Sequence, residues 1–228
     1  MSRKIYLTLI LIIVLLVAAV ATFYLLRSKE SSVLTVGVNV GDVFTYQMVS
    51  SVELYEDWDL ALDSSILDTF ADLNNAKYCR VEITNVDIPN VSYTITWEFK
   101  NGTTQNANGM VNIQDGTYSG YYWNIYASGL TQGSISRPSD SEEPIIIETI
   151  MESYTSGDRE INFIQRLGQS YDTNDASFST QCYVYHYIYF DKQIGILTFF
   201  RNMEIYTSPP VIVTVEYKLI DSNIAQIP

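Results

Sequence analysis

The side chain best suited to catalysis is His186, the only histidine of the chain, which lies in the run YVYHYIYF at positions 183–190. Nucleophilic catalysis needs a base beside the nucleophile, and that base is usually histidine. Because side chains alternate across a strand, the four tyrosines of the run share one face and His186 shares the other with three apolar residues, Val184, Ile188 and Phe190. We interpret His186 as a partly buried residue of an inner face. A binding-site histidine and a catalytic base are the alternatives.

Acidic side chains form three clusters: Asp57 with Asp59, Asp140 with Glu142 and Glu143, and Asp172 with Asp175. Two carboxylates at a fixed separation across a cleft perform glycoside hydrolysis, so an acidic hydrolase is one alternative. The last cluster offers oxygen ligands to calcium, although it lacks the spacing and the glycine of an EF-hand. We interpret all three as solvated, and the sequence contains no GxSxG, P-loop or HExxH spacing. We therefore predict no catalytic residues, no metal site, no cofactor and no enzymatic activity.

The aromatic content is high, with 18 Tyr, 3 Trp and 9 Phe. One cluster contains Tyr121, Tyr122 and Trp123, with Tyr118 and Tyr126 nearby. Rows of tyrosine stabilise a sheet through cross-strand pairs, and the alternative is that they line a pocket or an adhesive surface. A hydrophobic ligand would occupy an apolar hollow between a curved sheet and a helix that lies over it.

The elements that carry these side chains read as strands, because apolar and polar residues alternate with period 2. We predict strands at 33–40, 43–55, 79–86, 91–100, 110–114, 117–123 and 211–220. We predict turns at Gly41-Asp42, 87–90, Asn101-Gly102, Asp115-Gly116 and 191–195. Pro209 and Pro210 fit the entry of the last strand.

One segment has helical spacing instead, with Leu62, Ile66 and Phe70 on one face, and it predicts an amphipathic helix over about 59–74. The segment 144–154, PIIIETIMESY, fits a weak helix or a buried strand equally well. A sheet of about ten strands tends to curl. The predicted fold class is therefore mainly β, a curved antiparallel sheet or half-barrel with one packed amphipathic helix, and a two-sheet sandwich is the alternative.

Residues 5–26 are 22 positions without a charge, bracketed by Arg3, Lys4 and Arg27. About 20 apolar residues suffice for a helix to cross a membrane. We predict an uncleaved signal anchor, a transmembrane helix that makes residues 1–30 the membrane anchor and residues 31–228 a separate β-rich domain. The alternative is a cleaved signal peptide ending near Ala21.

Three features place the C-terminal domain outside the cytoplasm. Sequons begin at Asn90 and Asn101, both at predicted turns. Cys79 and Cys182 either form a single disulfide or remain two buried thiols. The body is rich in Tyr, Thr, Asn and Ser. The net charge of −13 repels phosphates, so we expect no nucleic-acid partner.

Three separated blocks, GVNVGDVFTY (37–46), YTSGDREINFI (154–164) and YFDKQIGILTFF (189–200), resemble motifs of a family of archaeal membrane-anchored surface proteins. The Asp-Lys-x-x-Gly hairpin at 191–195 is also similar to that of half-barrel lipoprotein carriers of the LolA/LppX type. This second resemblance implies a curved sheet that shelters acyl chains, and neither supplies catalytic residues.

The expected function is a non-enzymatic, membrane-anchored extracytoplasmic β domain that binds a lipid-like or apolar ligand in its curved sheet. The alternative is a structural or adhesive cell-envelope protein without a pocket. The expected partners are the membrane, through residues 5–26, a lipid or other apolar ligand, and envelope proteins.

Overall fold

The computed structural model describes residues 35–54, 75–137, 144–154, 157–168, 182–207 and 210–224. The predicted anchor at 5–26, the predicted helix at 59–74 and the three acidic clusters lie outside these ranges. Within the described ranges, no helix has both the length and the apolar character needed to cross a membrane.

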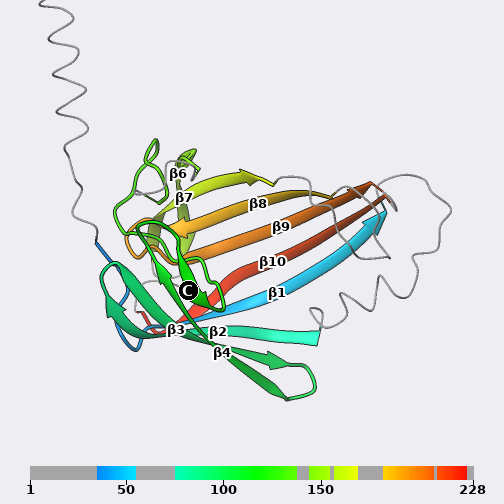
Figure 1. The fold of residues 1–228 in the computed structure, drawn as a ribbon, viewed down its shortest axis with the longest axis horizontal. Helices are drawn as coiled ribbons and strands as arrows, with labels where there is room; N and C mark the ends of the chain where they lie inside the picture. Colours follow the sequence, from blue (N-terminus) through cyan, green and yellow to red (C-terminus); the bar gives the residue numbers. More distant parts are fainter. Residues whose placement is uncertain are drawn as a thin grey trace, which may run out of the picture. The chain divides into compact units, whose positions relative to one another are not determined.

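Ten strands form one open antiparallel sheet, so the prediction of a mainly β fold is confirmed and the two-sheet sandwich is wrong (Figure 1). The strands are β1 (Val43–Leu54), β2 (Ala76–Asp87), β3 (Asn90–Phe99), β4 (Thr104–Asn112), β5 (Tyr118–Gly120), β6 (Glu148–Tyr154), β7 (Gly157–Leu167), β8 (Cys182–Asp191), β9 (Leu197–Thr207) and β10 (Pro210–Ser222). Their order in the sheet is β5-β4-β3-β2-β1-β10-β9-β8-β7-β6.

The first and last strands, β1 and β10, pair in the middle of the sheet, while β5 and β6 are its two edges. The connection from β5 to β6, residues 121–147, must therefore pass from one edge to the other. Single bridges attach it on the way, between Ile125 and Ile196 and between Ser128 and Thr35. We call the described part of this connection, residues 121–137, the crossover.

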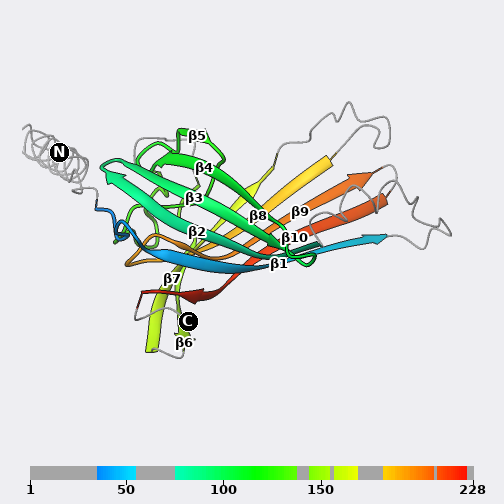
Figure 2. The same cartoon turned by 90° about the horizontal axis from the view of Figure 1, so that it is seen from below.

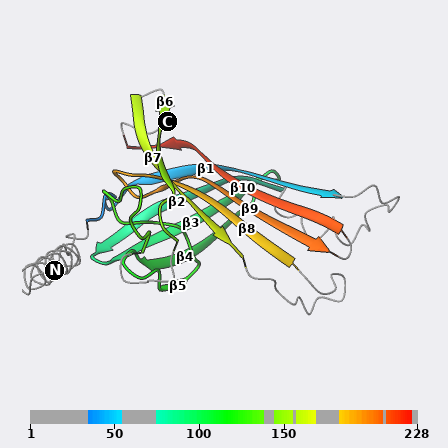
Figure 3. The same cartoon turned by 90° about the horizontal axis from the view of Figure 1, so that it is seen from above.

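The sheet is curved. Figures 2 and 3 show β3, β4 and β5 on one side of β8–β10, and β6 with the adjoining part of β7 on the other. We call the sheet face that bears Tyr46, His186 and Tyr217 the inner face, and the face that bears Tyr187 and Phe199 the outer face. The crossover lies against the inner face, because its bridges join it to Thr35 and Ile196 and its tryptophan packs on Tyr46.

Alternation along the strands places the core on one face of the sheet, and on β8 this is the face that the sequence predicted. On β3, four side chains at alternate positions are buried: Val91, Tyr93, Ile95 and Trp97. On β8, Val184, Ile188 and Phe190 are buried, while Tyr183 on the opposite face is exposed. Burial of such apolar side chains is the dominant stabilising contribution to folding.

Two of the predicted strands are shorter in the structure than the sequence predicted. The predicted strand at 33–40 is reduced to a bridge at Thr35, because Gly37 backs onto the 191–195 turn, where a Cβ would lie 2.3 Å from the carbonyl oxygen of Gln193. The predicted strand at 117–123 ends at Gly120, whose positive φ of 71° turns the chain off the sheet edge. The predicted strand at 110–114 belongs to β4, which begins earlier, at Thr104.

The remaining open alternatives are also resolved. The segment 144–154 forms strand β6 from Glu148 onward, preceded by a buried Ile146, and it contains no helix. Cys79 on β2 and Cys182 on β8 are free, buried thiols, and the order of the sheet places three strands between them. Burial raises the pKa of Cys79 to about 12, so this thiol is protonated at neutral pH.

Candidate binding cavity

The three sequence blocks that resemble the surface-protein motifs meet in space. Gly37 of the first block packs against the backbone of Gln193 in the third. The hydroxyl of Tyr46, also in the first block, donates a hydrogen bond of 3.0 Å to the carbonyl oxygen of Leu197. Arg159 of the second block pairs with Asp191 of the third. These blocks therefore build one structural unit at one end of β7, β8 and β9.

The ion pair at the centre of this unit is buried, with 7% of the Arg159 side chain and 1% of the Asp191 side chain exposed. Arg159 donates from Nε to Oδ2 and from Nη2 to Oδ1, the second at 2.8 Å. The same Oδ1 accepts the backbone N–H groups of Gln193 and Ile194 at 2.8 and 2.9 Å. The carboxylate beside it raises the pKa of Arg159.

The 191–195 turn also fixes the crossover. The carbonyl oxygen of Gly195 accepts the N–H of Tyr126 at 2.8 Å, and the carbonyl oxygen of Lys192 accepts that of Gly129 at 2.7 Å. Gly195 has a φ of 77°, and a Cβ on it would lie 2.0 Å from the carbonyl oxygen of Tyr126. Only glycine allows this approach without a shift of the backbone.

The side chains of Tyr93 and Arg137 also hold the crossover in place. Tyr93 on β3 donates to the carbonyl oxygen of Tyr121 at 2.9 Å and accepts the backbone N–H of Trp123 at 2.8 Å. Arg137, 1% exposed, donates to the carbonyl oxygen of Ile125 and lies 4.3 Å from the ring centre of Tyr126. A buried guanidinium that meets carbonyl oxygens and an aromatic face is well stabilised.

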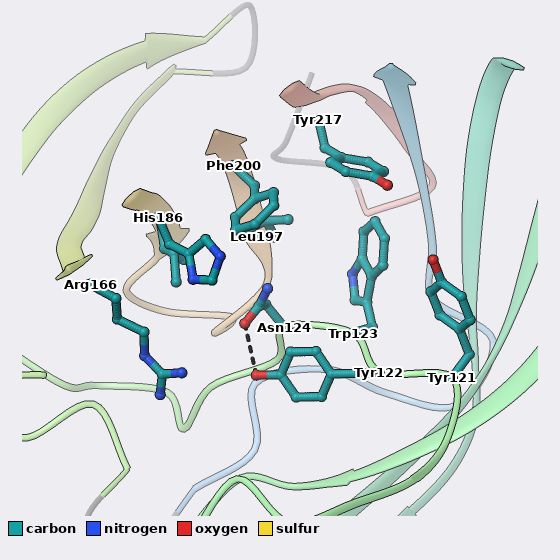
Figure 4. A pocket seen from close by; sticks show the side chains of 10 residues that line it. Tyr121, Tyr122, Trp123, Asn124, Arg166, His186, Leu197, Phe200 and Tyr217 are labelled. Atoms are coloured by element: carbon teal, nitrogen blue, oxygen red, sulfur yellow. Dashed lines mark hydrogen bonds between the residues drawn. The ribbon is translucent and has the colours of Figure 1, made fainter. Parts of the chain in front are cut away.

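Between the crossover and the inner face lies a cavity of about 240 Å³ (Figure 4). Its walls come from four strands and from the crossover: Tyr121, Tyr122, Trp123, Asn124, Arg166, His186, Ile188, Leu197, Phe200 and Tyr217. At roughly 30 Å³ per water molecule, this volume equals that of about eight waters. Aromatic and aliphatic walls with few polar groups are typical of small-molecule sites.

The aromatic rings of the cavity pack edge-on or tilted. The ring centres of Trp123 and Tyr217 are 5.5 Å apart at 87°, and those of Phe200 and Tyr217 are 5.9 Å apart at 49°. The His186 ring lies 5.6 Å from that of Phe200. These separations are those of favourable aromatic pairs, so the rings form a connected wall.

His186 lies on the inner face, as predicted, and it lines the cavity. Burial is the main cause that lowers the pKa of its imidazole, and the charge of Arg166 on the neighbouring strand lowers it further. The charge of Glu204 and a hydrogen bond with Asn202 oppose this lowering of the pKa. The imidazole is therefore neutral at pH 7. No nucleophile accompanies it in the described cavity wall, and no group of three His, Cys, Asp or Glu side chains suited to a metal occurs in the described ranges.

A second hollow, of about 280 Å³, continues the first along β8, β9 and β10 and shares His186, Phe200 and Tyr217 with it. Val213 and Val215 make its far wall apolar. The two hollows together form a groove longer than either one.

The sequence identified part of this site. The aromatic cluster at 121–123 and the inner-face histidine were both candidates for lining a pocket, and both line it. The contribution of Arg166 and the clamp formed by Arg159 and Asp191 were not predicted, because each depends on strand pairing between distant segments. Nothing in the sequence around Arg137 indicates that this side chain is buried.

We compared the chain with protein-family models, with curated protein sequences and with solved structures, and none of the three comparisons found a match.

Proposed function

We propose that this chain is a non-enzymatic, membrane-anchored extracytoplasmic β domain that holds an apolar or lipid-like ligand between the crossover and the inner face. The observation that carries the proposal is the aromatic cavity at His186, Phe200 and Tyr217, which continues into a second hollow with an apolar wall at Val213 and Val215. An apolar ligand gains free energy by leaving water for such walls, at about 25 cal/mol per Å² of buried apolar surface.

The parts of this proposal that concern the half-barrel, the amphipathic helix and the membrane anchor rest on the sequence. The curved sheet is a half-barrel, the segment 59–74 is an amphipathic helix packed on it, and residues 5–26 anchor the domain in the membrane with the C-terminal part outside the cytoplasm. The resemblance of the 191–195 hairpin to that of LolA/LppX-type carriers supports a sheltering role. Digestion of intact cells with a protease tests the topology, since only an external domain is cleaved.

A structural or adhesive role remains the second candidate, and the outer face is the observation that favours it. Tyr187, Tyr189 and Phe199 form an aromatic strip there, with Arg201 and Ile150 beside it. Tyrosine-rich surfaces provide large contact areas at a low entropic cost. In that case the outer face, and not the cavity, would be the functional surface.

Two adjacent phenylalanines separate these candidates. Phe200 lines the cavity and Phe199 lies on the outer face, and both side chains are half-buried. The full chain is purified from membranes into an amphipathic polymer, and bound molecules are extracted and identified by mass spectrometry. We expect the wild type and Phe199→Glu to release the same apolar molecule and Phe200→Glu to release none. Absence of a bound molecule in the wild type, or its equal retention in both variants, contradicts the binding function.

A further inference from the structure

Resting on the extracytoplasmic location in the proposed function, we infer that Asn101 carries an N-linked glycan whose first sugar packs against Phe99, and that Asn90 stays unmodified. Both asparagines begin an Asn-x-Ser/Thr sequon, Asn90 before Val-Ser and Asn101 before Gly-Thr. The two sequons differ in exposure, in backbone path and in hydrogen bonds, and these differences select Asn101.

Asn101 lies in the loop between β3 and β4, at the free end of this hairpin (Figure 1). Two backbone hydrogen bonds of 2.9 Å close the loop, from the N–H of Phe99 to the carbonyl oxygen of Thr103 and from the N–H of Gly102 to the carbonyl oxygen of Phe99. Gly102 has a φ of 81°, as is common at the end of a three-residue hairpin loop. Asn101, Gly102 and Thr103 are all exposed, so an enzyme can reach the sequon in the folded domain.

The side chain of Asn101 is fixed at its oxygen and free at its nitrogen. Its Oδ1 accepts the backbone N–H of Thr103 at 2.9 Å and the Thr103 hydroxyl at 2.7 Å. An Asn side chain that bonds two residues ahead in this way stabilises a turn. Nδ2 donates no hydrogen bond within the described part of the chain, so no such contact has to break before a sugar is attached to it.

The sequon at Asn90 lies inside the sheet. Asn90 is the first residue of β3 and pairs with Asp87 on β2 and with Asn112 on β4. Val91, in the middle of the sequon, is 0% exposed, and no hydrogen bond joins the described side chains of Asn90 and Ser92. A transferase would have to separate β3 from both neighbouring strands to reach this asparagine.

A hollow of about 400 Å³ lies beside Asn101, and its other lining residues are Asn75, Phe99, Thr103 and Gln105. The half-buried ring of Phe99 gives the hollow an apolar wall, while the exposed side chains of Asn75 and Gln105 contribute amide groups. A sugar ring has an apolar face of C–H groups and hydroxyls at its rim. The first sugar on Asn101 can therefore bury its apolar face against Phe99 and offer its hydroxyls to the amides.

The attachment is a glycosyl transfer that needs no oxidant or reductant. The sugar comes from a lipid-linked oligosaccharide, in which C1 of the first sugar is bonded to a phosphate oxygen. A bond forms between Nδ2 of Asn101 and C1, and the bond from C1 to the phosphate oxygen breaks. The lipid phosphate leaves with the electron pair, and the proton lost from Nδ2 passes to a base of the transferase.

The test is peptide mapping by mass spectrometry of the full chain, purified from membranes of the cells that natively produce it. We expect the peptide that contains Asn101 to carry a glycan and the peptide that contains Asn90 to carry none. Thr103→Val keeps the shape of the side chain and removes the hydroxyl, so it should abolish the modification. Asn90→Gln is the matched control and should leave the glycan on Asn101 unchanged.

The contact with Phe99 is tested by the melting temperature of the full chain in an amphipathic polymer, with and without the glycan. Protein without the glycan is produced in a host that lacks the transferase. The glycan should raise the melting temperature of the wild type by about 2–4 °C, the shift of one ordinary contact in a chain of this length, and that of Phe99→Leu by clearly less. Equal shifts in the two proteins overturn the contact.

The outcomes separate this inference from the proposed function. An unmodified Asn101 in a domain that protease digestion of intact cells shows to be external overturns the inference and leaves the proposed function intact. A domain that the protease cannot reach contradicts the location on which both rest. A glycan on Asn90, or one that persists on Asn101 in Thr103→Val, overturns the selection of Asn101 by the fold.

Discussion

Asp191 accepts four hydrogen bonds through its two carboxylate oxygens, two from Arg159 and one each from the backbone of Gln193 and Ile194. One side chain thus joins β7 to β8 and shapes the turn that carries the crossover. A buried ion pair contributes little net stability over an apolar pair of the same size, but removal of one partner is costly. The structural importance of Asp191 is therefore best measured by substitution.

Asp191→Asn keeps the size of the side chain and removes its charge beside a buried guanidinium. We expect the free energy of unfolding to fall by roughly 3–5 kcal/mol, measured by denaturant titration of the full chain. Glu216→Gln is the control, since it disrupts the half-exposed pair with Arg201 and should cost about 1 kcal/mol or less. Comparable losses in the two variants would show that the Asp191 clamp is not special.

His186 predicts a pH dependence of stability. Its pKa is lowered in the folded state by burial and by Arg166, against the opposing charge of Glu204, while the unfolded side chain titrates near 6.5. As pH falls below about 6.5 the unfolded chain binds the proton first, so the free energy of unfolding decreases until the lowered pKa is passed. The slope from this group is at most about 1.4 kcal/mol per pH unit.

His186→Gln removes this titration. Between pH 7 and pH 5 the wild type should therefore lose more stability than the variant, as measured by thermal or denaturant unfolding at each pH. Identical pH profiles for the two proteins would mean that His186 is as well solvated in the folded chain as in the unfolded one.

At the scale of elements, the 191–195 turn holds the crossover in place through backbone hydrogen bonds. The crossover has little regular structure of its own, and its position depends on backbone contacts with Gly195 and Lys192 and on the side chains of Tyr93 and Arg137. Because Trp123 and its neighbours form one wall of the cavity, any change that lifts the crossover should also open the cavity.

Gly195 and Gly129 allow this to be tested, because both have a φ of 77° but only Gly195 has a close neighbour. Alanine at either position bears the cost of a left-handed backbone, about 1–2 kcal/mol. Gly195→Ala should add about 1–3 kcal/mol for the collision with the carbonyl of Tyr126. Calorimetry of both variants measures the difference, and equal melting temperatures would contradict the proposed docking of the crossover on the turn.

The sequence predicted elements better than it predicted their assembly. Alternation predicted β1, β2, β3, β10 and the inner face of β8, because period 2 is a local property of the chain. It did not predict β7, and it left β6 open between a helix and a strand. It overextended the strands at 33–40 and 117–123, where packing at Gly37 and the positive φ of Gly120 decide the path. The cavity could be suspected from its aromatic cluster, but its other wall is assembled by strand pairings that no local pattern encodes.

At the scale of the whole described domain, the strand order explains why a cavity exists at all. The terminal strands β1 and β10 occupy the centre of the sheet, and the chain must cross from edge strand β5 to edge strand β6. A curved sheet bridged by such a connection encloses space unless side chains fill it. Most of the side chains that line this space are aromatic, and they leave a cavity of about 240 Å³.

The central claim is that this inner hollow binds apolar molecules, and calorimetric titration of the full chain with naphthalene tests it most directly. We expect saturable binding of one molecule per chain in the wild type and in Phe199→Glu, and loss of binding in Phe200→Glu with its melting temperature recorded as a check on folding. Binding that is absent from the folded wild type, or that survives in Phe200→Glu and is lost in Phe199→Glu, would contradict the account.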